Sequence, residues 1–297
     1  NRYASWGGWD TSAPKEARLA YILKNLKNRW TWKGETVHHL VETVLKSLRA
    51  GKPLTAEAAL ADLTQVMRRD FRSSKDKKYL QDPKRNLGLF EHEYQKPVSD
   101  PVWKTIHDEA SACLKNFMAS SFYKELEADD KKDWLVIEDL EDFDFDPSTN
   151  AQGFPSTNAQ GAGVKVFVKL DFARKKNGKV EIFDWKTGKE EKGATIQLGA
   201  YAIYAMKKWG IPISEIRAYL VFLSAADPKP QEEPLTEELI RESSQTITKS
   251  VGAMRTLLLD VKHNIPKPRE FFRFTENERL CSNCNFYKMC EKYSKVA

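Results

Sequence analysis

Apolar residues recur every three or four positions through most of the first 130 residues. The pattern is clearest in three stretches, 33–48, 54–71 and 102–126. This spacing gathers apolar side chains on one face of a helix, so each stretch is predicted to be an amphipathic helix. The N-terminal portion of the chain is therefore predicted to be mainly helical.

From about residue 134 the pattern changes to that of strands. Three segments rich in Val, Ile and Phe are predicted to be strands: 164–173, 179–186 and 216–224. Asn177-Gly178 separates the first two, and Asn-Gly between apolar runs predicts a tight hairpin. Asp171 and Asp184 are therefore expected on neighbouring antiparallel strands.

Helices are predicted after the hairpin. The stretch 194–210 is apolar nearly all round and closes at Gly210, which predicts a buried helix. A long helix is predicted from about Thr236, whose hydroxyl can cap it. This order predicts an α/β fold, a mixed sheet flanked by helices with a large helical portion before it. We expect a helical portion at 1–130, a core at 131–226, and a C-terminal helix and cysteine segment at 227–297. The heptapeptide PSTNAQG occurs at 147–153 and again at 155–161 and is assigned no function.

Composition narrows the class of protein. Forty-eight Lys and Arg residues against 42 Asp and Glu residues give a net charge of +6, which favours polyanionic partners, although a solubilising surface charge explains it as well. No apolar run approaches the roughly 18 residues that span a bilayer. We therefore expect a soluble, cytoplasmic protein with no membrane partner.

The hairpin carries the first candidate site. Asp184 and Lys186 are two apart on a predicted strand and face the same side, and Asp171 can approach them across the turn. Two carboxylates and a lysine suit a hard divalent cation and the water that it activates, with the carbonyl of Trp185 as a further ligand. The alternative is an exposed ion pair at a strand end.

Two more pairs accompany this triplet. His38 and Glu42 are four apart on one edge of a predicted helix, where the alternative is a histidine satisfied beside the core. Gln197 and Tyr201 are four apart on the predicted buried helix. Packing alone explains Tyr201, but a buried Gln197 amide needs hydrogen-bond partners.

The ordered set G-x3-H-x3-E, a strand ending in Asp171, D-x-K at Asp184–Lys186 and Q-x3-Y resembles the RecB-like branch of the PD-(D/E)XK nuclease superfamily, over residues 34–204. The resemblance implies a restriction-endonuclease-like fold and a metal-dependent nuclease that hydrolyses DNA phosphodiesters. By this resemblance, the expected ligands of Mg²⁺ or Mn²⁺ are His38, Asp171 and Asp184, with Lys186 catalytic, Gln197 and Tyr201 assisting substrate and site, and Glu42 and Trp185 in support. Val168 and Lys169 stand where the family has a glycine before the first aspartate.

Three of the four cysteines form a C-x2-C-x5-C pattern at Cys281, Cys284 and Cys290. Clustered thiols in a reducing compartment suggest a metal, and thiolates alone do not separate zinc from iron. Within the family the pattern resembles members with a 4Fe–4S cluster, such as AddB, the CRISPR-adaptation exonucleases and exonuclease V. Their fourth cysteine precedes the histidine helix, and this chain has none there. Cys113 lies on the apolar stripe of its own predicted helix, so we expect the fourth ligand upstream of Asn1.

The iron–sulfur members act mostly on single-stranded DNA ends. The resemblance therefore implies an exonuclease whose partner is DNA, single-stranded or with free ends, in repair or defence. The alternative is a nuclease-fold module that binds DNA without cutting it, within a larger complex. The intact set of Asp171, Asp184 and Lys186 favours the enzyme.

Overall fold

The computed structural model describes residues 7–147, 163–188, 195–290 and 292. The backbone forms two compact units, each drawn from separate stretches of the chain. Unit 1 lies within Asn1–Trp32, Gln65–Ile106 and Arg255–Ala297, and unit 2 comprises Lys33–Thr64 and His107–Met254. The three-part division expected from the sequence stays a prediction. The PSTNAQG repeat lies outside the described residues, apart from its first proline.

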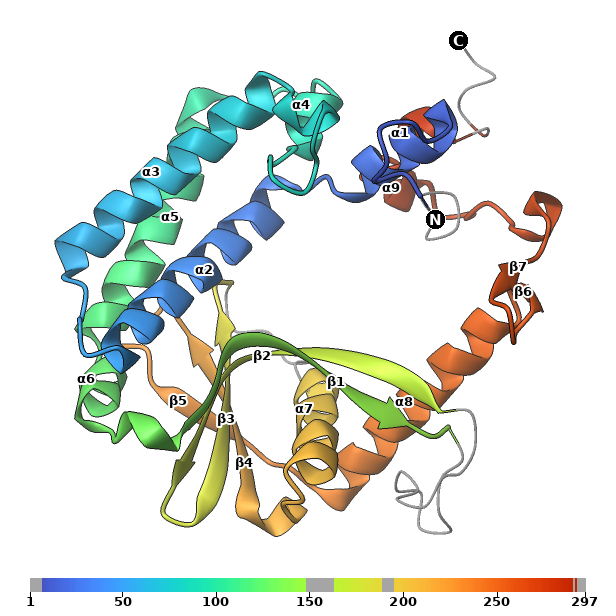
Figure 1. The fold of residues 1–297 in the computed structure, drawn as a ribbon. Coiled ribbons are helices and arrows are strands. Elements are labelled where there is room, and N and C mark those ends of the chain that lie inside the picture. Colours follow the sequence, from blue (N-terminus) through green and yellow to red (C-terminus); the bar gives the residue numbers. More distant parts are fainter. Residues whose placement is uncertain (1–6, 148–162, 189–194, 291, 293–297) are drawn as a thin grey trace. The chain divides into compact units, whose positions relative to one another are not determined.

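Unit 2 contains a five-stranded mixed sheet (Figure 1). Its strands are β1 (Trp134–Phe145), β2 (Val164–Lys176), β3 (Lys179–Lys186), β4 (Ile216–Phe222) and β5 (Pro230–Glu233), in that spatial order. β3 and β4 pair in parallel and the other neighbours pair antiparallel. The predicted α/β fold and its strands are confirmed, and β5 is an addition that the sequence pattern did not show.

The β2–β3 hairpin turns at Asn177 and Gly178, as predicted. Both residues have positive φ, 51° and 74°, and such a pair matches the twist of two antiparallel strands. Phe172 pairs with Phe183 in the hairpin register. The same register carries Asp171 and Asp184 on adjacent strands.

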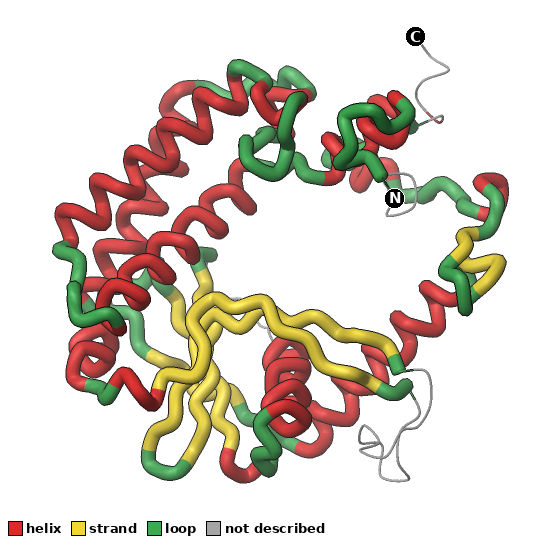
Figure 2. The backbone as a smooth tube through the Cα atoms, viewed as in Figure 1, coloured by secondary structure: helices red, strands yellow, loops and turns green. Residues whose placement is uncertain are grey.

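Helices cover both faces of the sheet (Figure 2). α7 (Thr195–Lys208) lies on one face, where Leu198 and Ala202 belong to a buried cluster with strand residues. α8 (Glu237–Arg255) follows, capped by Thr236, whose hydroxyl accepts from the Leu239 N–H at 3.1 Å. At Gly199 a Cβ would lie 2.0 Å from Ser243 Oγ, so only glycine permits this approach of α7 and α8.

The opposite face is covered by aromatic side chains. Phe117 lies 5.6 Å from Trp185 between ring centroids, and Phe122 lies 5.0 Å from Phe183. These phenylalanines belong to α5 (Asp100–Ala119) and α6 (Ser121–Ala128). One continuous helix through 102–126 was predicted, and this is wrong at Ser120. The Ser120 hydroxyl accepts from the Tyr123 N–H at 3.0 Å and starts a new helix.

The other long helices match their predicted stretches closely. They are α2 (Arg29–Arg49) and α3 (Ala56–Lys75). Among the described residues, none of the helices combines the length and the apolar character needed to cross a membrane.

Unit 1 joins short elements from both ends of the chain and from the stretch 65–106. They are α1 (Lys15–Lys24), α4 (Phe90–Glu93), α9 (Glu278–Cys281) and the strands β6 (Leu258–Asp260) and β7 (Ile265–Pro266). Phe286 and Met289 pack against a buried cluster that includes Leu23. The Asn285 amide donates to the Leu26 carbonyl at 2.9 Å, and Tyr94 OH donates to the Asn285 carbonyl at 2.7 Å. The cysteine segment is therefore docked onto the end of α1.

Candidate active site

Three side chains from separate elements converge in unit 2: His38 on α2, Glu138 on β1 and Asp171 on β2. His38 Nδ1 lies 3.0 Å from Glu138 Oε1 and 3.3 Å from Asp171 Oδ1. One ligand atom from each residue lies within 4.8 Å of the other two. Both carboxylates are buried. The group offers an imidazole nitrogen and carboxylate oxygens, which are ligands for a divalent cation.

A hydrogen-bond network holds the D-x-K pair beside this group. Lys186 Nζ lies 2.5 Å from Asp184 Oδ2 and donates to Gln197 Oε1 at 3.2 Å. The Gln197 amide donates to Asp184 Oδ1 at 3.0 Å and to Tyr201 OH at 2.6 Å. Tyr201 OH in turn donates to the Lys169 carbonyl at 2.6 Å. The four motif residues on β3 and α7 therefore form one connected chain.

Trp185 connects the two strands through its backbone. Its N–H donates to Asp171 Oδ2 at 2.7 Å. Its indole is buried against Phe172 and Phe117. The side chain of Trp185 thus packs in the core while its backbone fixes the orientation of the Asp171 carboxylate.

Burial and neighbouring charges shift the pKa values of the residues in the candidate site. Burial alone would lower the pKa of His38, but the Asp171 and Glu138 carboxylates outweigh it and raise that pKa to about 10. Burial raises the pKa of Asp184 to about 6, together with the nearby Asp171 charge and against the opposing effect of Lys186. Burial also favours the neutral form of Glu138, but its bonds to His38 and Lys169 prevail and lower its pKa.

Glu138 was not found by sequence reasoning. It is one of five acidic residues in β1, so its type alone did not separate it from its neighbours. Its backbone has φ 55°, an unusual value within a strand. An acid inside the apolar run around Ile137 was the only available signal.

Lys169 is, with Val168, one of the two residues that stand where the family resemblance leads one to expect a glycine before Asp171. Its ammonium lies 2.6 Å from Glu138 Oε2, and its carbonyl accepts from Tyr201. The departure from the family pattern therefore adds a cation beside the carboxylates and leaves the backbone contact to α7 in place.

Three of the expected residues lie differently from the expectation. The Glu42 carboxylate lies 2.7 Å from Lys46 Nζ and 3.5 Å from His39 Nδ1, and it is not one of the three converging ligands. Gln197 was expected to be buried and is exposed, because it lies near the beginning of α7. Asp184 lies outside the three-residue group as well, so its role as a metal ligand stays a prediction.

The C-terminal thiols are arranged more loosely. Cys281 ends α9 and is buried, and Cys284 and Cys290 are partly exposed. The Cys284 N–H donates to the Cys281 carbonyl at 3.1 Å. Within the described residues, the three Sγ atoms are not gathered as closely as the ligand atoms around His38. Cys113 is 2% exposed in unit 2, consistent with the predicted core thiol.

Comparison with known proteins supplies the family. No curated protein matches the chain. A solved structure titled "Crystal structure of SSO0001" is 16% identical, covers 68% of this chain and 78% of its own, and superposes with a TM-score of 0.30. The sequence pattern of the PD-(D/E)XK nuclease superfamily matches residues 14–291. Since that match spans most of the chain, the protein belongs to the PD-(D/E)XK nuclease superfamily, a superfamily of metal-dependent nucleases.

Proposed function

We propose that this protein is a Mg²⁺- or Mn²⁺-dependent deoxyribonuclease of the RecB-like branch, acting on single-stranded DNA or DNA ends as an exonuclease. One observation carries the proposal. The ligand atoms of His38, Glu138 and Asp171 lie within 4.8 Å of one another, next to the paired Asp184 and Lys186. Oxygen ligands with an imidazole suit Mn²⁺ and Mg²⁺ better than soft cations.

Each residue has a distinct task in this proposal. A bound divalent cation lowers the pKa of a water molecule and neutralises charge on the phosphate. His38, Glu138 and Asp171 hold that cation, and Asp184 lies beside them on β3. The Lys186 side chain is 29% exposed against 2% for Asp184. Lys186 is therefore the member of the pair that can orient the attacking water or contact the phosphate.

Gln197 and Tyr201 position this pair. Gln197 accepts from Lys186 and donates to Asp184, so one amide fixes the separation of the two groups. Tyr201 fixes the amide in turn, and its phenol is anchored to the backbone of β2. A substitution at Tyr201 should therefore act through Gln197 and Lys186.

The DNA preference rests on the family resemblance and the net charge. A chain with a net charge of +6 is attracted to a polyphosphate backbone. The iron–sulfur members that the cysteine pattern resembles act mostly on single-stranded ends. The charge favours nucleic acid in general, and the resemblance favours a free DNA strand as the substrate.

We also propose that Cys281, Cys284 and Cys290 bind a 4Fe–4S cluster, with zinc as the alternative and a further cysteine ahead of residue 1. The thiols lie on a segment that contacts the end of α1, so a bound metal would tie the two ends of unit 1 together. Iron and zinc contents per chain, with the visible absorbance of purified protein, test this. Zinc without visible absorbance would overturn the iron assignment.

Metal-dependent digestion tests the nuclease. End-labelled single-stranded and duplex DNA would be incubated with Mg²⁺, Mn²⁺ or EDTA, and circular single strands would distinguish an endonuclease. Asp184→Asn should abolish cleavage in both metals. Asp144→Asn, the same change at an exposed acid of β1, should leave it intact.

DNA binding without cleavage, in folded and metal-loaded wild-type protein, would overturn the proposal. That outcome would instead support the non-cleaving DNA-binding module.

A further inference from the structure

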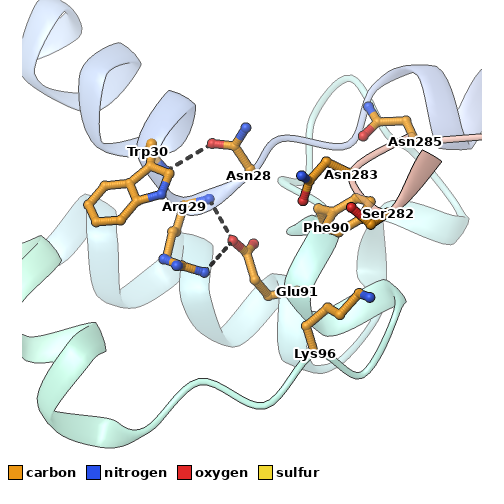
Figure 3. Close-up of a pocket in the computed structure, with 9 residues that line it drawn as sticks. All are labelled: Asn28, Arg29, Trp30, Phe90, Glu91, Lys96, Ser282, Asn283 and Asn285. Carbon is orange, nitrogen blue, oxygen red and sulfur yellow. Dashed lines mark hydrogen bonds and ion pairs between the residues drawn. The ribbon is translucent and has the colours of Figure 1, made fainter. Parts of the chain in front are cut away.

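A polar pocket of about 580 Å³ lies in unit 1, apart from the residues of the candidate active site (Figure 3). It is formed by the beginning of α2, by α4 and the turn after it, and by the loop that carries Cys284. Its lining residues are Asn28, Arg29, Trp30, Phe90, Glu91, Lys96, Ser282, Asn283 and Asn285. Its volume is within the range of small-molecule sites in proteins.

Glu91 supplies the strongest indication of a ligand. The residue is 5% exposed. Its Oε1 atom accepts from the backbone N–H and from Nη1 of Arg29, both at 3.1 Å. Its Oε2 atom is also buried, yet it accepts no hydrogen bond from the described part of the chain. A buried carboxylate oxygen without a donor is costly, so this atom indicates a ligand that brings an N–H group.

Trp30 offers a flat apolar surface at the same pocket. Its side chain is 51% exposed, which is unusual for tryptophan. The Arg29 guanidinium lies 4.9 Å from the centre of its ring. Figure 3 shows the indole next to Arg29, which also bonds to Glu91. A planar ligand could therefore stack on Trp30 while its edge reaches the carboxylate.

The charge of the pocket suits a phosphate on that ligand. Arg29 and Glu91 pair with each other, and Lys96 adds a second cation to the lining. Two cationic residues against one carboxylate leave one positive charge. Asn283 adds a side-chain amide that can donate or accept.

We propose that this pocket binds one unpaired nucleobase that carries an exocyclic amino group, on a single strand of DNA. The amino group donates to Glu91 Oε2, the ring stacks on Trp30, and Lys96 contacts the backbone phosphate. Carboxylates accept hydrogen bonds from the cytosine amino group, and thymine has a carbonyl at that position. The proposal rests on the proposed action on DNA and adds a preference for cytosine over thymine.

The test compares two pyrimidine strands of equal length. The inactive Asp184→Asn protein would be titrated with fluorescent dC12 and dT12 in Mn²⁺, with anisotropy for affinity and tryptophan emission for stacking. We expect dC12 to bind about tenfold more tightly than dT12, the discrimination of a single good base contact. Glu91→Gln should abolish most of that ratio. Glu57→Gln, at an exposed acid of α3, should keep it.

Because Glu91 is buried, its substitution can disturb the fold. A second variant at an exposed residue therefore tests the same pocket. Trp30→Ala changes an exposed side chain, and it should weaken binding of both strands and remove the fluorescence response. Equal affinity of the Asp184→Asn protein for dC12 and dT12, or an unchanged ratio in Glu91→Gln, would overturn the pocket assignment. If wild-type protein still digests both strands in Mn²⁺, the nuclease proposal survives that result. If neither strand binds, the pocket assignment fails, and the nuclease proposal fails with it only if the wild-type protein digests neither strand.

Discussion

The proposed metal ligands of unit 2, which are His38, Glu138 and Asp171, and the thiols near the C-terminus differ in what holds them in place. Asp171 and Glu138 belong to long paired strands, and His38 belongs to a helix of 21 residues. The thiols belong to a four-residue helix, a turn and the residue after a three-residue 3₁₀ helix. Every residue of the first group has a hydrogen-bond partner from a distant part of the sequence. In the described part of the chain the hydrogen bonds of the cysteines themselves are local, and the neighbouring Asn285 makes the contact with Leu26.

From this difference we predict how each region would respond to a metal. Strand pairing and buried contacts fix the carboxylates, because moving one of them would disrupt the sheet core. Short turns have few such contacts, so metal bonds would supply the order there, as they do in small metal-bound domains. We expect a preformed site in unit 2 and a metal-ordered one in unit 1.

The largest expected effect on the rate of DNA cleavage comes from replacing Lys186 in the candidate active site of unit 2. Lys186→Ala removes the exposed N–H donors of the D-x-K pair, and cleavage should fall about 10²–10³-fold, as for other preorganised donors. Single-turnover cleavage of a labelled strand in Mn²⁺ measures it. Lys175→Ala, an exposed lysine of the same hairpin, should cleave normally. A change of similar size in both variants would show that stability, not the site, is affected.

A second variant tests metal binding in unit 2 by weakening the candidate site without unfolding the protein. Glu138→Gln keeps the size of the side chain but removes a charge that contacts His38 and Lys169. We expect Mn²⁺ affinity to fall at least about 10–100-fold, because losing a group that only supports the ligands already costs that much and Glu138 is a proposed ligand itself. Calorimetric titration measures the affinity, and thermal unfolding of the metal-free variant checks the fold. Unchanged affinity would exclude Glu138 from the site.

The pH dependence provides a third test of the sheet site. The folded-state pKa of His38, about 10, lies above its ordinary value of 6.5. The folded protein therefore holds a proton that the unfolded chain releases between these values. In EDTA, the unfolding free energy should fall by up to about 1.4 kcal/mol per pH unit across that window. Below pH 6.5 the stabilisation from His38 is fully present.

Bound Mn²⁺ should flatten this slope, because the cation replaces the proton as the partner of the carboxylates. Chemical denaturation at pH 7, 8 and 9, with and without Mn²⁺, measures both slopes. Parallel slopes in the two conditions would argue that the cation does not bind His38.

The smallest effect is expected when a change in the cysteine segment is tested for its influence on Mn²⁺ binding in unit 2, because the two regions should be independent. Cys284→Ser removes one thiol from the C-terminal segment, and the amount of iron or zinc bound per chain should fall. Mn²⁺ affinity at the sheet should not change, since no ligand of that site is altered. Elemental analysis and calorimetry on one preparation decide this. A loss of Mn²⁺ affinity would show that the two regions are coupled.

Much of the fold follows from local sequence signals. Asn177-Gly178 predicts the hairpin because few other residues adopt two successive positive φ values. The register follows, and with it the approach of Asp171 to Asp184. Thr236 predicts the start of α8 by its hydroxyl, and the observed cap confirms it.

Other features depend on tertiary contacts and could not be predicted from the sequence. The break at Ser120 lies within a helical pattern that continues on both sides, so periodicity alone did not reveal it. Glu138 joins the site because β1 pairs with β2, and nothing local distinguishes it from the acids that follow. Gln197 is exposed because α7 begins there, a boundary that apolar content does not define.

Lys169 has a consequence for the charge balance of the candidate site. Three carboxylates, those of Glu138, Asp171 and Asp184, face three basic groups, those of Lys169, Lys186 and the protonated His38. The basic groups offset part of the repulsion among the carboxylates, although the charge of Asp171 still contributes to the raised pKa of Asp184. We therefore expect the chain to fold before the ion is supplied, so that production of the protein and its activation are separate events.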